Sequence, residues 1–535
     1  MRKTNRWMRM LAGLVSLAML LCGAGAALAV EEGTLRTAIL HDITTMDVAE
    51  TTDDYMIPMN VFERLFETRK SGTEAVVEKS LCTDFTVSED GLRYDFTLPE
   101  GVIFSNGSAL TASDVQYSFE RLLKKAKQNT DIPLEVVGGE AVMNGEADTL
   151  AGFEVQDDTH FSITLTAPNV GFTAELSAPA MSIVDRETTE NAAAFGQDPA
   201  DTIGSGPYKV TEWVSNDHYT LVYNDKYRGP EPSVKRVEVR VIPDAGTQSL
   251  LFANGDLDLL DLANLDSQLV KVSYKDNPQY QDRIVSTPKA GLTFIVLNEN
   301  QKYLQDVRVR KAIGMAIDVE EIIDGIYSGD ATQENGIIPA GVWAHNPDLT
   351  GFTYDPDGAR ALLKEAGYAD GEVTFELSMD TTANTSIQLV YQTVSMRLMD
   401  VGINAVIQPY DHAAFLEKRM AGGMDSFIGR WGMDYNDPAN IMATFFGGKT
   451  QTAQRSLNYP DEEILNRVAA ASAIVDDDAR KAEYQALEKK IIGEDAAWIP
   501  LVEEQHLYCM GDRVEAFIPQ WAGFTDFYAS DVTLK

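Results

Sequence analysis

The segment from Gly429 to Pro438 carries the side chains with the clearest potential for binding chemistry. It places Trp431 and two acids, Asp434 and Asp437, among glycines and a proline, directly after a strand-like run. Tryptophan offers a large apolar face with one hydrogen-bond donor, and an acid beside it can hold an ammonium group by a charge-assisted hydrogen bond. Asn-Asp and Asp-Pro are also typical of ordinary turns, so the segment alone leaves both interpretations open.

Known catalytic motifs are missing from the sequence. None of the six histidines belongs to an H-E-x-x-H pattern, and there is no G-x-S-x-G elbow or phosphate-binding loop. Gly204 to Gly206 has a Gly-x-Gly pattern, but Pro207 follows it and no helix is expected there, which argues against a dinucleotide site. Carboxylates are numerous enough for glycoside hydrolysis, yet no pair stands out. We therefore expect no catalytic residues and no enzyme.

We expect no metal site and no cofactor. Cys82 and Cys509 are far apart and match no metal-binding spacing. We interpret them as two isolated buried thiols, although an exported protein can also pair such residues. His412 follows Asp411, but no second ligand lies at helical spacing, which favours an exposed loop histidine.

Length and charge limit the class of protein. A chain of 535 residues is too long for one compact core, so at least two domains are expected. The apolar fraction of 44% is enough to form those cores. The net charge of −38 argues against nucleic-acid binding, which needs a basic footprint.

Residues 1–29 have the pattern of a cleaved signal peptide. A basic start is followed by the apolar run Leu11 to Leu21, and Ala27-Leu28-Ala29 fits the small-x-small cleavage rule. Lipid anchoring at Cys22 is an alternative, but Leu21, the residue before it, fits a lipoprotein signal poorly. Either route predicts an extracytoplasmic protein, in the periplasm or at the outer face of the cytoplasmic membrane.

Strands and helices alternate in the second half of the chain. Val373 to Leu377 has the alternation of a strand, Ile387 to Val401 the three-and-four spacing of a helix, and Ile403 to Gln408 is strand-like again. Asp306 and Asp355 are placed to cap helices. This order predicts an α/β fold with helices covering a sheet. Earlier, Asp84 to Glu89 and Arg93 to Leu98 flank an Asp-Gly turn and predict a hairpin, and Tyr55 to Phe66 predicts a helix.

A series of short motifs follows one another along the mature chain. They are Gly107 to Ser118, Gly204 to Tyr208 with Glu212-Trp213, Asn224 to Tyr227, Ile242 to Ala245, Gly255 to Asp258, Asp306 to Ile313, and the loop from Trp431 through Asp434 to Pro438. In this order they resemble the large solute-binding proteins of ABC importers for dipeptides and oligopeptides. The resemblance covers nearly all of the mature chain.

The resemblance implies a two-lobed clamshell of the type II periplasmic-binding-protein kind, with an extra domain inserted in the first lobe. Lobe 1 would comprise residues 30–70, 203–288 and 503–535, the inserted domain residues 71–202, and lobe 2 residues 289–502. A solute would be buried between the lobes and delivered to permease subunits in the membrane. We expect a monomer whose ligand is a peptide.

The resemblance also assigns roles in the site. Asp434 would anchor the ammonium group of the peptide, and the main chain of Trp431, Gly432 and Met433 would bond the peptide backbone, as an added strand does. Arg430 and Tyr435 complete the set of candidate residues. Dipeptide-specific members carry an arginine after the strand that matches Val373 to Leu377, but Ser378 to Ser386 contains none. Longer peptides, or another solute such as a metal chelate or a sugar, therefore stay open.

Overall fold

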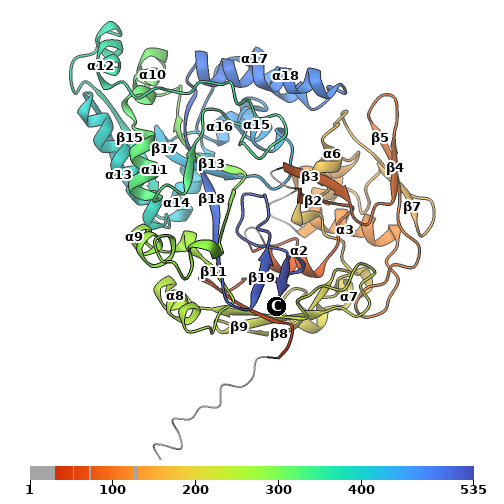
Figure 1. The fold of residues 1–535 in the computed structure, drawn as a ribbon. Helices are drawn as coiled ribbons and strands as arrows, with labels where there is room; N and C mark the ends of the chain where they lie inside the picture. The colour runs from red at the N-terminus through yellow and green to blue at the C-terminus, as the bar shows by residue number, and fades with distance from the viewer. Residues whose placement is uncertain (1–30, 52–53, 72–73, 126–129) are drawn as a thin grey trace, which may run out of the picture.

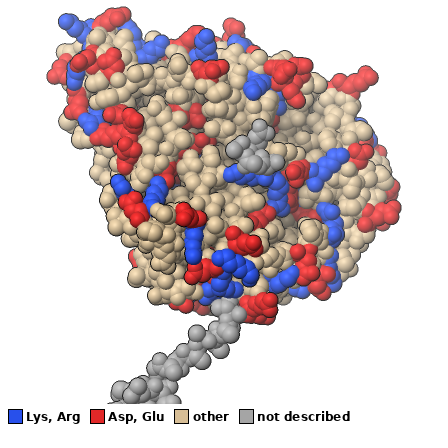
Figure 2. Space-filling model, viewed as in Figure 1, with Lys and Arg blue, Asp and Glu red and all other residues tan. Residues whose placement is uncertain are grey.

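The computed structural model describes residues 31–51, 54–71, 74–125 and 130–535. The predicted signal peptide and Cys22 lie outside these ranges. Within them, no helix combines the length and the apolar character needed to cross a membrane. Cys82 and Cys509 are both buried and unpaired, as expected. On the face shown in Figure 2, acidic and basic side chains are interspersed, so the negative net charge does not gather in one patch there.

Residues 34–39 and 208–241 build a four-stranded sheet, in the order β1-β10-β9-β8. Its strands are β1 (Thr34–Ile39), β8 (Tyr208–Val214), β9 (His218–Tyr223) and β10 (Arg236–Val241). Only β1 and β10 run parallel, in the register Leu35↔Val237. The buried side chains of this sheet pack with α2 (Met56–Val61) and with C-terminal residues such as Phe527 and Val532.

A second sheet lies within residues 84–164, in the order β4-β5-β7-β6. The strands are β4 (Asp84–Val87), β5 (Arg93–Thr97), β6 (Phe153–Val155) and β7 (His160–Thr164), and α3 (Ala112–Lys125) packs against them. The predicted hairpin is β4–β5, paired antiparallel. Stacked rings of Phe96, Phe161 and Phe153 hold the strands together, with centroids 5.2 and 5.1 Å apart.

The largest sheet has the order β11-β18-β13-β17-β15-β16, with β12 and β14 also pairing with β18. Its strands are β11 (Leu259–Asp261), β12 (Ile284–Pro288), β13 (Gly291–Leu297), β14 (Ala331–Gln333), β15 (Val373–Asp380), β16 (Ile403–Tyr410), β17 (Ser426–Gly432) and β18 (Trp498–Met510). β18 runs without a break from residues 289–502 into residues 503–535, so the residue at which the lobes divide stays a prediction.

Helices cover both faces of this sheet (Figure 1). On one face are α10 (Val307–Ala316), α11 (Val319–Ile326), α12 (Pro356–Glu365) and α13 (Thr385–Asp400), which pack with Ile295 and Leu297 of β13. On the other are α14 (His412–Met420), α15 (Ala439–Phe446), α17 (Glu462–Ala471) and α18 (Asp477–Glu488), which pack with Phe294 and Val296. β13 is buried at every position and, apart from Thr293, carries no polar side chain, as expected for a strand covered on both faces.

Local sequence signals fixed most of these boundaries. Asp306 accepts a hydrogen bond from the Arg308 amide at 2.9 Å, and Asp355 accepts one from the Gly358 amide at 2.9 Å, so both cap helices as predicted. The predicted helix from Tyr55 to Phe66 is too long, because the chain becomes extended at Phe62 and Phe66 already belongs to β2 (Phe66–Ser71). Phe62 and Phe66 are buried in separate cores. Their spacing in the sequence resembles the apolar face of a helix, although the two side chains do not share one.

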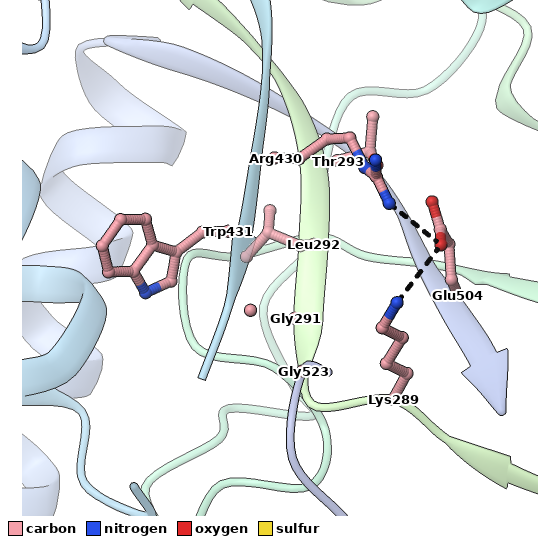
Figure 3. Close-up of a pocket in the computed structure, with 9 residues that line it drawn as sticks. Lys289, Gly291, Leu292, Thr293, Arg430, Trp431, Glu504 and Gly523 are labelled. Carbon is pink, nitrogen blue, oxygen red and sulfur yellow. Dashed lines mark ion pairs between the residues drawn. The ribbon is translucent and has the colours of Figure 1, made fainter. Parts of the chain in front are cut away.

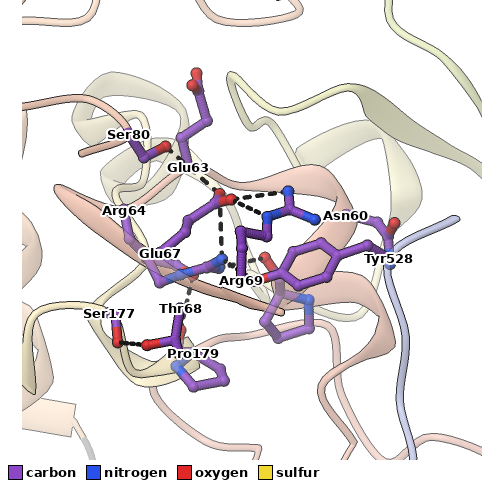
Figure 4. A network of polar contacts seen from close by, with 12 residues as sticks. Asn60, Glu63, Arg64, Glu67, Thr68, Arg69, Ser80, Ser177, Pro179 and Tyr528 are labelled. Atoms are coloured by element: carbon purple, nitrogen blue, oxygen red, sulfur yellow. Dashed lines mark hydrogen bonds and ion pairs between the residues drawn. The ribbon is translucent and has the colours of Figure 1, made fainter. Parts of the chain in front are cut away.

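A buried polar network joins β2 to the C-terminal segment (Figure 4). Arg64 is fully buried, forms an ion pair with Glu67 at 3.3 Å and donates a hydrogen bond to the Tyr528 hydroxyl at 2.9 Å. Arg69 pairs with the same Glu67 at 2.8 Å and lies over the Tyr528 ring. Burial acts to raise the pKa of Glu67, but Arg69 and Arg64 outweigh it, and the pKa falls below its ordinary value.

We expect Arg64→Met to destabilise the protein by about 3–5 kcal/mol, because Glu67 loses a buried counter-ion and the Tyr528 hydroxyl loses a donor. Urea denaturation at neutral pH measures the change. Arg186→Met is the matched control, since the Arg186–Glu190 pair is exposed and lies within one helix, and removing it should cost less than about 0.5 kcal/mol. Equal losses in the two variants would contradict the assigned role of the network.

Candidate functional site

The C-terminal end of β17 forms the wall between two adjoining cavities, both lined by Arg430 and Trp431. The first cavity, of about 150 Å³, lies between β13, β17, Lys289, Glu504 and Gly523. The second, of about 350 Å³, lies between β17, α13 and α14 and reaches Phe445 and Arg455. Arg430 and Trp431 therefore border a cavity on each side of β17, whereas Asp434 is not among the residues that line either cavity.

The free edge of β17 faces the second cavity. β15 pairs with β17 at Leu377↔Ser426 and Ser378↔Phe427, and within the described residues it pairs no further. From Ile428 to Gly432, β17 therefore keeps a strand neighbour on its β13 side only. Such an edge can accept an extended chain as an additional strand.

Three charged side chains face one another across the first cavity (Figure 3). Glu504 lies 3.6 Å from Arg430 and 3.9 Å from Lys289. Burial would raise the pKa of Glu504, but Arg430 and then Lys289 outweigh it and lower that pKa. Burial lowers the pKa of Lys289, against the attraction of Glu504. The cluster of two cations and one anion leaves a net positive charge beside Gly291.

Asp437 and Asp434 lie three residues apart but have opposite surroundings. Asp437 is buried and forms a bidentate ion pair with Arg480, with both distances 2.8 Å. Asp434 is partly exposed, and no cation pairs with it among the described residues. Burial raises the pKa of Asp434 to about 6, against a hydrogen bond from Asn440 that lowers it. Asp434 is thus an acid held without a counter-ion at the rim of the loop.

Asn440 links Asp434 to Trp431. Its side-chain oxygen accepts a 2.8 Å hydrogen bond from the Trp431 indole, and its side chain also bonds Asp434. The Trp431 ring meets Phe445 edge-on at 5.4 Å, which holds the indole against α15. The loop therefore presents an apolar ring and an unpaired acid as one positioned unit.

The other predicted residues have mainly structural contacts. Met433 is fully buried in the core of the largest sheet, where its amide donates to Ala290 and its carbonyl accepts from Gly523, at 2.8 and 3.0 Å. Tyr435 lies in the core that contains α3 and β5. Gly432 lies against Gly523 so closely that a Cβ would come within 2.9 Å of the Gly523 Cα.

Sequence reasoning missed several residues that line the cavities. Lys289, Glu504 and Gly523 come from segments that the fold brings together over more than two hundred positions in the chain. Arg419 lies on α14, one turn before β17, and Arg455 is separated from Trp431 by α15 and the helix Lys449–Gln454. Asn440 was within reach, because it lies two positions after the motif that ends at Pro438. No group of His, Cys, Asp and Glu able to hold a metal ion occurs within residues 31–51, 54–71, 74–125 and 130–535.

The topology and the loop define a type II periplasmic-binding-protein fold, and comparison with known proteins identifies the family. Residues 76–453 match the model of the bacterial extracellular solute-binding proteins, family 5. The chain belongs to this family, as the motifs in its sequence indicated.

Similar proteins bind different solutes. The chain is 27% identical to the probable D,D-dipeptide-binding periplasmic protein of Escherichia coli K12, covering 89% of this chain and 90% of that one. It is 24% identical to the heme-binding protein A of Haemophilus influenzae, covering 89% and 87%. The ABC transporter-associated periplasmic binding protein from Helicobacter pylori, solved with the peptide STSA, superposes with a TM-score of 0.74 at 25% identity, covering 94% and 98%.

The raised pKa of Asp434 predicts a pH-dependent stability of the ligand-free protein. A carboxyl whose pKa is higher in the folded than in the unfolded state destabilises the fold progressively from about pH 4 to about pH 6. We expect Asp434→Asn to leave stability unchanged near pH 4 and to increase it by about 1–2 kcal/mol above pH 6, allowing for the remaining solvent access.

Urea denaturation of refolded protein from pH 4 to 8 tests this expectation. Asp437→Asn is the matched control of opposite sign, because it leaves Arg480 buried without its partner and should cost about 3–5 kcal/mol at pH 7. If Asp434→Asn destabilised the protein as Asp437→Asn does, Asp434 would have a hidden counter-ion.

Proposed function

We propose that this protein is the extracytoplasmic solute-binding component of an ABC importer and that it captures peptides for delivery to permease subunits in the membrane. Family membership supports the class, and two of the three relatives above are named or solved with peptide ligands. These relatives are binding proteins by name, and we propose no catalytic activity. Export through the signal peptide at residues 1–29 is part of the same proposal.

The observation that carries the peptide assignment is Asp434, an acid without a cation in a loop whose other acid is neutralised. A peptide has a free ammonium group at its N-terminus, and this group would supply the missing charge. The β17 edge from Ile428 to Gly432 would bond the peptide main chain, and Trp431 would contact it beside Arg430.

Met433 and Tyr435 would act differently from the other candidates. Met433 would hold the β17 end against Ala290 and Gly523, and Tyr435 would anchor the loop in the neighbouring core. In the same loop, Asn436 donates a hydrogen bond to the Ala75 carbonyl at 2.8 Å, across to β3 (Glu74–Lys79). We propose that this loop both contacts the ligand and joins lobe 2 to the inserted domain.

Metal chelates are the second candidate class, because a heme-binding protein is among the relatives. The edge of β17 and the unpaired acid favour a peptide over a chelate, since neither heme nor its carboxylates can fill the role of an ammonium group. Mass spectrometry of the solute that co-purifies with the native protein distinguishes the two classes directly.

Peptide binding through Asp434 predicts a double-mutant cycle. A random tripeptide library is first screened for a member that the wild-type protein retains. That tripeptide, with a free or an N-acetylated N-terminus, is then titrated by calorimetry into the wild-type protein and into Asp434→Asn. Either change alone should weaken binding about 30-fold or more, because each removes one partner of a buried charge pair worth ~2–5 kcal/mol. Together they should cost little more than one alone. Equal affinity of the wild-type protein for the free and the acetylated peptide would contradict the proposed binding of the ammonium group by Asp434.

The same site predicts a bell-shaped pH dependence of affinity. Asp434 must be ionised to bind an ammonium, so affinity should fall up to about tenfold per pH unit below about pH 6. It should also fall above about pH 8, where a peptide α-amino group loses its proton. In Asp434→Asn the acid limb should disappear while the alkaline limb persists. An acid limb that survives in the variant would assign the titration to another group.

A further inference from the structure

The loop after β17 packs against a segment that contains α4 (Asp131–Leu134) and α6 (Phe172–Glu175). Tyr435 of the loop is buried in the core of this segment, together with Phe172. We call the junction of residues 169–175 with residues 433–438 and α18 the α6 contact. It joins parts of the chain that are far apart in sequence, so its strength decides how firmly the loop is held.

The two sides of the α6 contact meet at their main chains. The Val170 amide donates a 2.9 Å hydrogen bond to the Ser472 carbonyl, which follows α17. Gly171 lies directly on the Asp437–Arg480 ion pair, where an added Cβ would come within 2.9 Å of the Asp437 carboxylate. The junction is therefore closely packed, and water screens charges beside it poorly.

Two acids lie side by side behind this junction. The side-chain amide of Asn169 donates 2.8 Å hydrogen bonds to both Glu135 and Glu175, so these carboxylates are neighbours. Glu175 is 3% exposed, and its Oε2 atom is buried without a hydrogen-bond partner in the part of the chain that the structure describes. Neither acid forms an ion pair with a described residue. A buried carboxylate is costly in such a place unless a proton or a cation neutralises it.

Both acids hold a proton more tightly than a free carboxyl group does. Burial raises the pKa of Glu175 well above its ordinary value, and the neighbouring Glu135 raises it further. Burial raises the pKa of Glu135 to about 7, against the hydrogen bond from Asn169 that lowers it. Asp131 on α4 and Asp437 across the contact add to both shifts. Because Asp437 belongs to the other side, its share of the shift exists only while the contact is formed.

Positive charge is scarce around the pair. Among the described residues, Arg480 is the only cation that pairs with one of these acids, and it already donates two hydrogen bonds to Asp437. Asp131 also raises the pKa of Asp434, the other acid of the loop. The further titratable side chains around Glu175, within the described ranges, are tyrosines whose raised pKa values keep them neutral: Tyr94 on β5, Tyr435, and Tyr484 on α18. The junction therefore carries excess negative charge unless it binds protons.

We propose that Glu135 and Glu175 form a pH-sensitive latch, which holds α6 against the loop after β17 while the pair carries a proton and loosens the contact when both acids are ionised. A state that binds protons more tightly than its alternative is favoured as the pH falls. The contact should therefore be strongest near the pKa of a free glutamate, about 4.3, and should weaken with rising pH until the pair has lost its proton.

The latch acts on the loop that carries Asp434. Loosening the α6 contact at alkaline pH would free this loop, and a solute held by it would be released more readily. That the loop holds a solute rests on the proposed function. The latch itself depends only on the contact, so it is tested on protein without any solute, and the two proposals can fail separately.

The test compares wild-type mature protein with Glu175→Gln from pH 5 to pH 9, after unfolding in guanidinium and refolding to remove native solute. Glutamine keeps the size of the side chain and can still accept from Asn169, but it carries no charge. The readout is hydrogen exchange of the Val170 amide, which bonds Ser472 across the contact, by residue-resolved mass spectrometry. Comparison of the two proteins at the same pH cancels the intrinsic pH dependence of exchange.

We expect similar protection of the Val170 amide in both proteins near pH 5, and at least about tenfold greater protection in Glu175→Gln at pH 9. The reason is that the contact in the wild type weakens by up to about tenfold per pH unit between the pKa of a free glutamate and that of the pair. The Leu165 amide is the internal reference, because it bonds Leu92 within the same segment and reports on unfolding of that segment alone. Its protection should change much less.

Glu503→Gln is the matched control. Glu503 on β18 is also buried and has a pKa raised to about 8, by burial and then by Glu334, but its hydrogen bonds go to Ala340, Gly341 and Thr332. This variant should leave the protection of the Val170 amide as in the wild type at every pH. Glu135→Gln is the second test variant, because it removes the other charge of the pair and should reproduce the effect of Glu175→Gln even if that variant fails to fold.

Two results would overturn the latch. One is equal protection of the Val170 amide in the wild type and in the folded Gln variants of the pair from pH 5 to pH 9. The other is an equally large change at Leu165, because the acids would then act within their own segment and not through the α6 contact. Either result leaves the proposed binding of a solute at Asp434 untouched.

Discussion

The buried ion pair between Asp437 and Arg480 is the constraint on which the candidate site depends. Its two 2.8 Å hydrogen bonds fix the loop at the point where β17 ends and α15 begins. The same carboxylate accepts from the Ala439 amide at 2.9 Å, which starts the helix. With this end fixed, Asn440 is placed to bond both Trp431 and Asp434. A structural acid thus positions Asp434, the acid proposed to bind the ligand, a few residues away.

Charge neutralisation distinguishes the fully buried arginines of this protein from its buried acids. The arginines meet carboxylates, as Arg64 does with Glu67 and Arg121 with Asp47. Several buried acids form no ion pair with a described residue, among them Glu175, Glu488 and Glu503. Around the end of β17, Asp434, Arg419 and Arg455 form no ion pair with a described residue, although Asn440 bonds Asp434 and Arg455 lies over two aromatic rings. Leaving such groups unpaired costs stability, and binding sites commonly carry this cost because a ligand supplies the missing charge.

The same loop also connects two cores. Met433 packs with β13 and α15, whereas Tyr435, two positions later, packs with the aromatic residues around β5. A solute that contacts Asp434 would therefore lie next to the loop that connects these two cores. Contacts between the solute and this loop can favour the closed arrangement of the lobes over an open one, because a ligand shifts a population towards the state it contacts best.

The sequence by itself determined the elements and the family. The alternation of β15, α13 and β16, the aspartate caps and the β4–β5 hairpin depend on local periodicity and turn chemistry, so they could be predicted. The ordered motifs indicated the family that the match over residues 76–453 shows.

The sequence also marked the loop from Trp431 to Pro438. It could not tell which of the two acids in that loop is neutralised, because Arg480 reaches Asp437 across forty-three positions. Nor could it bring Arg419 and Arg455 to one cavity or show that β15 leaves β17 after Phe427. Only the tertiary structure decided these points, because pairing and burial of charge depend on which distant segments pack together, and local patterns carry no record of that packing.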